Sequence, residues 1–280
     1  DAYFVAQFSE PFAEYGVWTE DGFEAGKTEA DGSSAGADLA FAMRAGADLT
    51  VEARVGISYV SVANARANLE AEAAGRNFDA LAKKTSDAWE DRLGRIRVKG
   101  GTDERRRVFY TALYRAFQMP TTFCDVNGEY LGFDRKVHKA DGFTSYTDFS
   151  LWDTFRTVHP LYNLVARDGQ RDMMRSLVEM ARAGGCLPRW PSGCGYTNCM
   201  FGTPADVAVT EAYLKGVRDF DIETAYAAMR QTGLTGKPAG SEFGGRNGLQ
   251  DYIEYGYLPS DKASKSVSAT LEYAWSDHAL

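Results

Sequence analysis

The sequence contains no long apolar run and no excess of basic residues. No window approaches the roughly 18 apolar residues of a membrane-spanning helix, so we predict no membrane span. The first residues, DAYFVAQFSEPF, lack the basic and apolar regions of a signal peptide, although a mature or excised segment would look the same. A net charge of −8 and a pI of about 5.1 argue against nucleic acid as a partner, because a phosphate backbone needs a basic surface.

Cysteine and histidine are also scarce, which disfavours a zinc site. Of the four cysteines, Cys186, Cys194 and Cys199 lie close together and Cys124 lies apart. They form no C-x-x-C pair, and none of the three histidines is near the cluster. We therefore favour buried free thiols over structural zinc, with one disulfide as the alternative for an exported protein.

Apolar and aromatic residues are abundant. The 280 residues are 44% hydrophobic and 13% aromatic, which is enough material for one large or two ordinary domains with a sizeable core. Together with 28 glycines, the aromatic content is typical of ligand-facing loops. A large aromatic core would explain it equally well.

Hydrophobic periodicity changes along the chain. Residues 1–62 predict four short antiparallel strands, which we interpret as the end of a larger β domain. Residues 63–98 change to helical spacing, with Asn77 or Asp79 as the candidate cap of a second helix. Thr102 is the expected N-cap of a further helix that ends before a proline.

The rest of the chain predicts helices separated by loops. Residues 121–145 predict a long loop or hairpin with Asn127-Gly128 as its turn. A Gly- and Pro-rich insertion covers residues 233–263. Paired helices with long loops on one side indicate an α/α toroid. We expect five helices, near 147–165, 168–183, 203–218, 221–232 and 264–280.

One loop concentrates residues that suit a sugar. The run Leu187–Pro191 is a poor helix and a poor strand, and it follows the helix stop Gly184-Gly185. Trp190 offers a flat face and Arg189 offers directed donors, as a polar ring-shaped ligand needs. The Arg189 guanidinium could equally well contact a ligand or pair with an acid such as Asp153.

Several strings resemble one enzyme family, in order and at plausible spacings. They are ISYVSV with NARANLEAE, VFYTALYRAF, DVNGEYLGFD, FSLWDTFRTVHPL, CLPRW, Met-x-Gly at 200–202, EAYLKGVRDFD, AYAAM, GYLPSD and SVSATLEYAWSDHAL. Together they resemble glycoside hydrolase family 92, the calcium-dependent, inverting exo-α-mannosidases, over nearly the whole chain.

The resemblance implies an α+β, mainly α fold. Residues 1–62 would be the end of an N-terminal antiparallel β-sandwich, 63–101 a helical linker, and 102–280 the first half of an (α/α)6-barrel catalytic domain. The start of the sandwich and the second half of the barrel would lie outside this chain, and the remainder of the same protein would be needed to complete the barrel. The mannose site is expected in a pocket at the domain interface.

The resemblance also sets expectations for the chemistry. In the family, an E-G-N-A-W-like motif supplies the acid, a G-N-E-P-like motif contributes to the calcium and sugar site, and a G-N-D-D-x-G-like motif supplies the basic carboxylates; none of these motifs occurs here. We therefore expect no catalytic residue and no Ca²⁺ ligand in this chain, both lying beyond Leu280, and an inactive isolated chain. The implied substrate is a mannose-containing glycan, α-1,2-linked and of N-glycan or mannan type. The implied location is secreted, periplasmic or cell-surface.

Two neighbouring residues are the first candidates for sugar contact. By resemblance, Asp153 lies in the pocket wall, where its carboxylate could accept bonds from mannose hydroxyls. The alternative is that Asp153 pairs with Arg156 or Arg189 and only shapes the wall. Trp152 is either a stacking platform or core filler, with core favoured.

Other ionisable side chains are weaker candidates. Glu211 stands where family members usually carry Asp, and a buried structural carboxylate is favoured over a site role. His159 is expected to cap or pack, and His278 has no local partner that would make it a base. Thr203-Pro204 and the small residues that follow Trp190 depart from the family pattern near the expected pocket, so they leave the preference among α-mannosides open.

Two other function classes remain open. The chain could be a non-catalytic carbohydrate-binding or scaffold fragment. It could also belong to a different α/α-barrel glycosidase or phosphorylase that carries its acid within the insertion, with Glu242 or Asp251 as the candidate.

Overall fold

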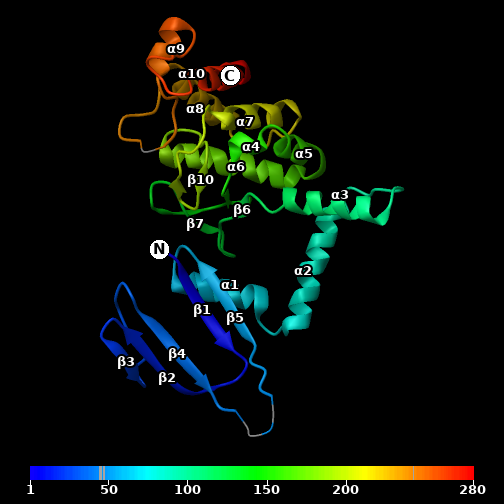
Figure 1. Cartoon of the computed structure of the whole chain (residues 1–280), viewed down its shortest axis with the longest axis vertical. Coiled ribbons are helices and arrows are strands. Elements are labelled where there is room, and N and C mark those ends of the chain that lie inside the picture. The colour runs from blue at the N-terminus through cyan, green and yellow to red at the C-terminus, as the bar shows by residue number, and fades with distance from the viewer. Residues whose placement is uncertain (44–45, 47, 242) are drawn as a thin grey trace. The chain divides into compact units, whose positions relative to one another are not determined.

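The chain forms two compact units, Asp1–Ser86 and Asp87–Leu280. The computed structural model describes residues 1–43, 46, 48–241 and 243–280, and Figure 1 colours them from blue to red along the chain. Mainly helical structure with small antiparallel sheets confirms the predicted fold class. The helices in these ranges include none that is long and apolar enough to cross a membrane. The three-part division into sandwich, linker and half barrel stays a prediction.

Within its described residues, the first unit holds five strands in two antiparallel sheets, where the sequence predicted four. β2 (Phe12–Thr19) pairs with β3 (Gly22–Ala25) and with β4 (Gly36–Phe41). β1 (Tyr3–Phe8) pairs with β5 (Ala53–Ser58). The unpredicted strand is β3, which has only four residues, all of them exposed, and therefore shows no alternation of buried and exposed positions.

Helix α1 (Val62–Ala73) packs on the β1–β5 pair. Val5 from β1 forms a small core with Ala65 and Leu69 from α1. The close approach depends on Gly56 in β5, where a Cβ would lie 2.2 Å from the carbonyl oxygen of Ala65.

Two longer helices follow, and both begin at side-chain caps. At the start of α2 (Phe78–Leu93), Asn77 Oδ1 accepts a backbone N–H at 3.0 Å, so the cap is Asn77 and not Asp79. At the start of α3 (Asp103–Ala116), the Thr102 hydroxyl accepts a backbone N–H, which confirms the predicted N-cap.

The predicted hairpin after α3 exists, but its turn was placed wrongly. β7 (Glu129–Leu131) pairs with β8 (Val137–Lys139), and the reversal between them is closed by a bond from Gly132 N to Lys136 O. Asn127-Gly128 instead makes a separate turn that leads into β7. Gly128 takes the left-handed conformation of this turn, with φ 85°. Two short strand pairs also form, β6 (Thr121–Thr122) with β9 (Tyr146–Thr147) and β10 (Pro191–Ser192) with β11 (Gly195–Tyr196).

The second unit continues with helices that the sequence largely predicted. They are α4 (Leu151–Thr154), α5 (Val158–Val165), α6 (Arg167–Gly184), α7 (Pro204–Leu214), α8 (Ile222–Leu234), α9 (Leu249–Tyr255) and α10 (Ser266–Ala279). Two expectations were wrong. The helix predicted over 147–165 is broken into α4 and α5, because Pro160 cannot donate a backbone bond and its ring excludes the carbonyl four residues earlier. The insertion over 233–263 contains α9.

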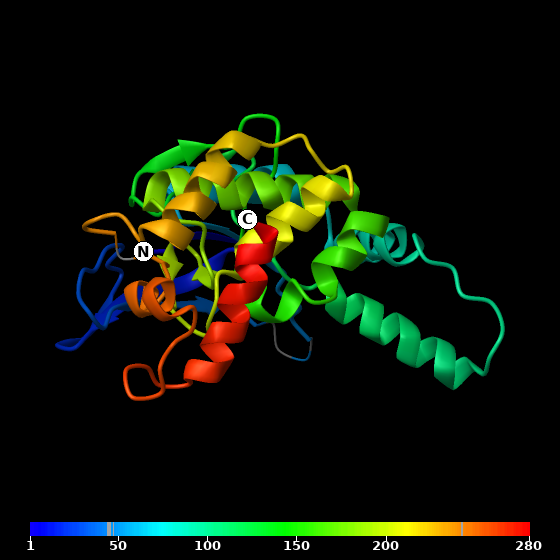
Figure 2. The same ribbon diagram turned by 90° about the horizontal axis from the view of Figure 1, so that it is seen from above.

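The main core surrounds α6. This helix contributes Met174, Leu177 and Val178, which pack with Ala208 and Val209 of α7. α5, α7 and α8 all lie against α6, which Figure 2 shows as a long green helix. α6 ends, as predicted, at the glycine pair, and the second glycine takes a left-handed conformation.

Candidate substrate site

The two leading candidates, Trp152 and Asp153, lie on the short helix α4. The Asp153 side chain is exposed, and within the described residues no hydrogen bond or ion pair engages its carboxylate. The Trp152 ring is half-buried, and its Nε1–H is shielded from solvent without a partner in the same part of the chain. The exposed, unengaged Asp153 carboxylate can accept hydrogen bonds from the hydroxyls of a sugar, whereas the shielded Trp152 N–H cannot reach one.

Neither arginine that could have neutralised Asp153 pairs with it. Arg156 Nη2 lies 2.6 Å from Glu272 Oε1 on α10. Arg189 is directed toward backbone carbonyls and Asn198. The structure therefore does not show the alternative in which Asp153 forms an ion pair with Arg156 or Arg189.

Arg189 organises the loop that follows the β10–β11 hairpin. Its side chain is buried, with 4% of the residue exposed. Nε donates to Cys199 O at 2.7 Å, and Nη2 donates to Asn198 Oδ1 at 2.6 Å and to the Asn198 carbonyl at 3.2 Å. These bonds give the guanidinium a role in holding residues 198–202, and its contact with a sugar stays a prediction.

Trp190 is half-buried at the start of the hairpin. Its carbonyl accepts bonds from the backbone N and the hydroxyl of Thr197, both at 3.1 Å. These two bonds close the hairpin and fix the backbone that carries the ring. Whether the ring stacks on a sugar stays a prediction.

The two candidate segments are joined by hydrogen bonds. Asp148, in the turn before α4, accepts from Ser192 Oγ at 3.0 Å and from Gly193 N at 3.3 Å. The residues of α4 and the hairpin after Trp190 are therefore held side by side, although they lie about forty positions apart in the sequence.

The weaker candidates behave as structural residues. His159 is buried with Nδ1 2.9 Å from Gln170 Oε1, and burial lowers the pKa of its imidazole to about 4, so the ring packs as expected. His278 is exposed near the end of α10. Glu211 was expected to be buried, but a quarter of its side chain is exposed, and its carboxylate lies 3.7 Å from Lys215.

The alternative acid candidates lie in the insertion. Asp251, on α9, is engaged by Lys262 at 2.7 Å. Glu242 lies outside the described residues.

A buried charged cluster was missed by the sequence interpretation. Asp206 and Arg246 are almost fully buried, with Asp206 Oδ2 3.9 Å from Arg246 Nη2 and Thr203 donating to the same carboxylate at 2.6 Å. Arg246 also pairs with Asp277 of α10. Burial raises the pKa of Asp206 to about 7. The three members are up to 71 positions apart, so no local motif predicts the cluster.

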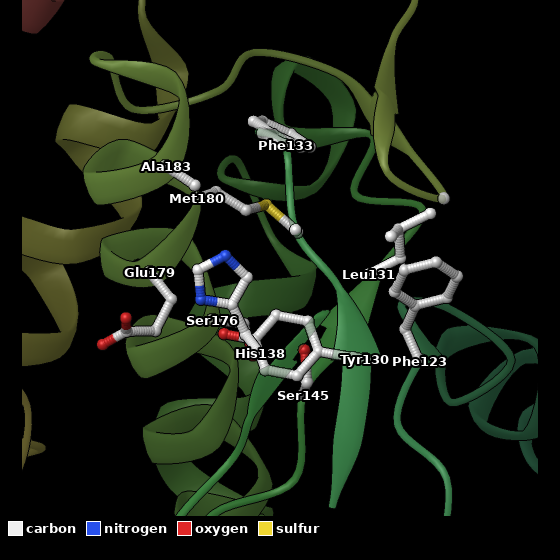
Figure 3. A pocket seen from close by; sticks show the side chains of 12 residues that line it. Phe123, Tyr130, Leu131, Phe133, His138, Ser145, Ser176, Glu179, Met180 and Ala183 are labelled. Atoms are coloured by element: carbon white, nitrogen blue, oxygen red, sulfur yellow. The ribbon is translucent and has the colours of Figure 1, made fainter. Parts of the chain in front are cut away.

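A small cavity lies between α6 and the β7–β8 hairpin, as Figure 3 shows. His138 stacks on Tyr130 with ring centroids 5.8 Å apart and lies 2.8 Å from Asp134 Oδ1. Burial raises the pKa of Tyr130 to about 12. The cavity volume is about 20 Å³, which suits one water molecule and not a sugar.

Metal-ligating side chains do not cluster in the part of the chain that the structure describes. In the ranges that the structure describes, no three His, Cys, Asp or Glu side chains group closely enough to hold a metal ion. The four cysteines are free thiols. Only Cys186 is buried and Cys199 is exposed, so the expectation of buried thiols was wrong for most of them.

Sequence comparison decides the family. Residues 64–280 match the profile of the glycosyl hydrolase family 92 catalytic domain. The chain belongs to glycosyl hydrolase family 92. The resemblance seen in the sequence motifs is thereby confirmed.

Family 92 proteins of known structure are similar over almost the whole chain. An inverting mannosidase of Bacteroides thetaiotaomicron is 31% identical with a TM-score of 0.91, covering 99% of this chain and 37% of its own. An α-mannosidase of that bacterium, solved in complex with mannoimidazole, is 32% identical with a TM-score of 0.85, covering 99% of this chain and 36% of its own.

A curated relative comes from the fungus Arthroderma benhamiae. It is described as an uncharacterized secreted glycosidase and is 29% identical over 238 residues, which is 80% of this chain. The present chain spans 26% of that protein. It therefore corresponds to between a quarter and two fifths of each of these three family 92 relatives.

Proposed function

We propose that the protein carrying this chain is an inverting exo-α-mannosidase that removes α-1,2-linked mannose from glycans of N-glycan or mannan type. Membership of family 92 and similarity to two bacterial mannosidases support the substrate class. The fungal relative's description supports export, so we also propose a secreted, periplasmic or cell-surface location.

The observation that carries the proposal is the unengaged carboxylate on α4. Asp153 is exposed with no bond to its carboxylate among the described residues, and the half-buried Trp152 precedes it in the same helix. In the proposed role, Asp153 accepts bonds from mannose hydroxyls and the Trp152 ring packs against the sugar. The chain then supplies part of the pocket wall.

We assign the chemical step to residues outside this chain. An inverting glycosidase needs a protonated carboxyl group and a second carboxylate about 6.5–9.5 Å apart, with room for a water between them. We propose that these groups, and the ligands of a required Ca²⁺ ion, come from the remainder of the protein. The short span of this chain relative to the similar mannosidases supports that division.

The test uses the full-length enzyme on an aryl α-mannoside and on α-1,2-mannobiose, with and without a chelator. We expect mannose release that needs calcium, with β-mannose as the first product in NMR spectra. Asp153→Ala should lower kcat/KM about 10- to 100-fold, since a hydrogen bond to a charged group contributes about 1.5–3 kcal/mol. Asp261→Asn, a change at another exposed aspartate, is the matched control.

Three outcomes would count against the proposal. First-formed α-mannose would contradict inversion. Unchanged kcat/KM in the Asp153 variant would remove that residue from the site. Turnover by the 280 residues alone would place the acid and base within this chain, and its loss on substitution of Asp251 would favour a different α/α-barrel glycosidase.

A further inference from the structure

Glu272 on α10 contacts both segments that carry the candidate site. Its Oε1 lies 2.6 Å from Arg156 Nη2, and its side chain is 15% exposed. Figure 2 shows α10, in red, beside the bright green turn that contains α4. The two partners are 116 positions apart, so this ion pair is a tertiary tie and not a local feature of either helix.

Arg156 links the Glu272 carboxylate to Trp152, the candidate aromatic residue. The Arg156 guanidinium lies 4.7 Å from the Trp152 ring centroid and 4.5 Å from that of Phe155. A guanidinium over an aromatic face is attracted by the ring, but it can rotate about its long side chain unless a second contact holds it. Glu272 supplies that contact and so holds the guanidinium over the Trp152 ring.

Glu272 also packs closely against the second segment, the loop of residues 198–202 that Arg189 holds. Gly202 has φ 73°, and a Cβ there would lie 2.9 Å from the Cβ of Glu272. The Gly202 carbonyl accepts a long bond of 3.5 Å from Arg189 Nη1. One turn further along α10, Ser276 Oγ accepts from Thr203 N at 3.4 Å. Arg189 holds this loop from one side, and α10 holds it from the other.

We infer that Glu272 is a positioning residue of the mannosidase site, acting through Arg156 on Trp152 and Asp153 and through Gly202 on the Arg189 loop. This inference rests on the proposed function. Glu272 itself needs no contact with the sugar, because its effect is to fix the geometry of groups that make one. Misplacement of such groups by about 1 Å can cost up to a hundredfold in rate.

The experiment is a double-mutant cycle in the full-length enzyme with α-1,2-mannobiose. Glu272→Gln keeps the shape but removes the charge, and we expect kcat/KM to fall on the order of tenfold. Asp153→Ala combined with Glu272→Gln should lose less than the product of the two single losses, because both changes act on the same contact. Arg156→Lys, which keeps the charge but not the planar fork, should resemble Glu272→Gln.

Controls separate positioning from general stability. Asp219→Asn breaks another tie between segments, the 2.8 Å ion pair with Arg175, away from α4, and should leave kcat/KM unchanged. Losses that multiply independently in the cycle, or a Glu272→Gln enzyme as active as Asp219→Asn, would overturn the inference. An inert Asp153→Ala change would instead remove Asp153 from the site, and a full-length protein that releases no mannose would refute the proposed function.

Discussion

Lowering the pH should remove the stabilisation that one buried histidine, His159, gives to the second unit. His159 is 1% exposed, and burial lowers the pKa of its imidazole from 6.5 to about 4. Because the folded state disfavours the charged ring, the stabilisation is fully present above pH 6.5 and is lost as the pH falls toward 4.

The size of the effect follows from the two pKa values. The difference between 6.5 and about 4 corresponds to about 3 kcal/mol, at about 1.36 kcal/mol for each pH unit. Linkage predicts a loss of about 2 kcal/mol by pH 5 and about 3 kcal/mol by pH 4. That loss is a large share of the stability of an ordinary domain.

The assay is urea unfolding of the full-length protein at a series of pH values, for the natural sequence and for His159→Gln. Glutamine has a similar volume and can still donate to Gln170, but it does not titrate. The difference in unfolding free energy should shrink by about 3 kcal/mol between pH 7 and pH 4. His278→Gln, at an exposed position, is the control. A difference that stays constant across this range would refute the reasoning.

Three more predictions concern stability. Burial raises the pKa of Asp206 from 3.8 to about 7, so the stabilisation held by its protonated form is full below pH 3.8 and is lost as the pH rises from there to about 7, and Asp206→Asn should flatten that decline in urea unfolding. Arg189→Lys should lower the free energy of unfolding by about 1–3 kcal/mol and speed hydrogen exchange in residues 197–203, because lysine cannot form the forked bonds to Asn198 and Cys199. Unchanged exchange would contradict this. Gly56→Ala should destabilise the first unit by about 1–3 kcal/mol, measured by thermal unfolding, because the new Cβ would overlap α1.

Local signals in the sequence predicted much of the fold. The Thr102 cap and the stop at Gly185 were found because each depends on residues within a few positions of the helix end. The break between α4 and α5, just before Pro160, follows from the same local rules, although helical periodicity on both sides concealed it. The helix α9 was missed because seven residues in a Gly- and Pro-rich insertion give too short a periodic pattern.

The environment of the candidate site depended on remote contacts. The sequence identified Trp152 and Asp153 but left the partner of Asp153 open between two arginines. The deciding residue is Glu272, which takes Arg156 from 116 positions away, and no pattern along one segment reports such a contact. The buried pair Asp206 and Arg246 escaped for the same reason.

The most direct test of the account is calorimetric titration of the full-length protein with mannoimidazole, the ligand seen in the similar Bacteroides enzyme. The account predicts that Asp153→Ala weakens binding about 10- to 100-fold, while Asp261→Asn binds as tightly as the natural protein. Equal affinity of all three proteins would contradict the claim that this chain contributes Asp153 to a mannose site.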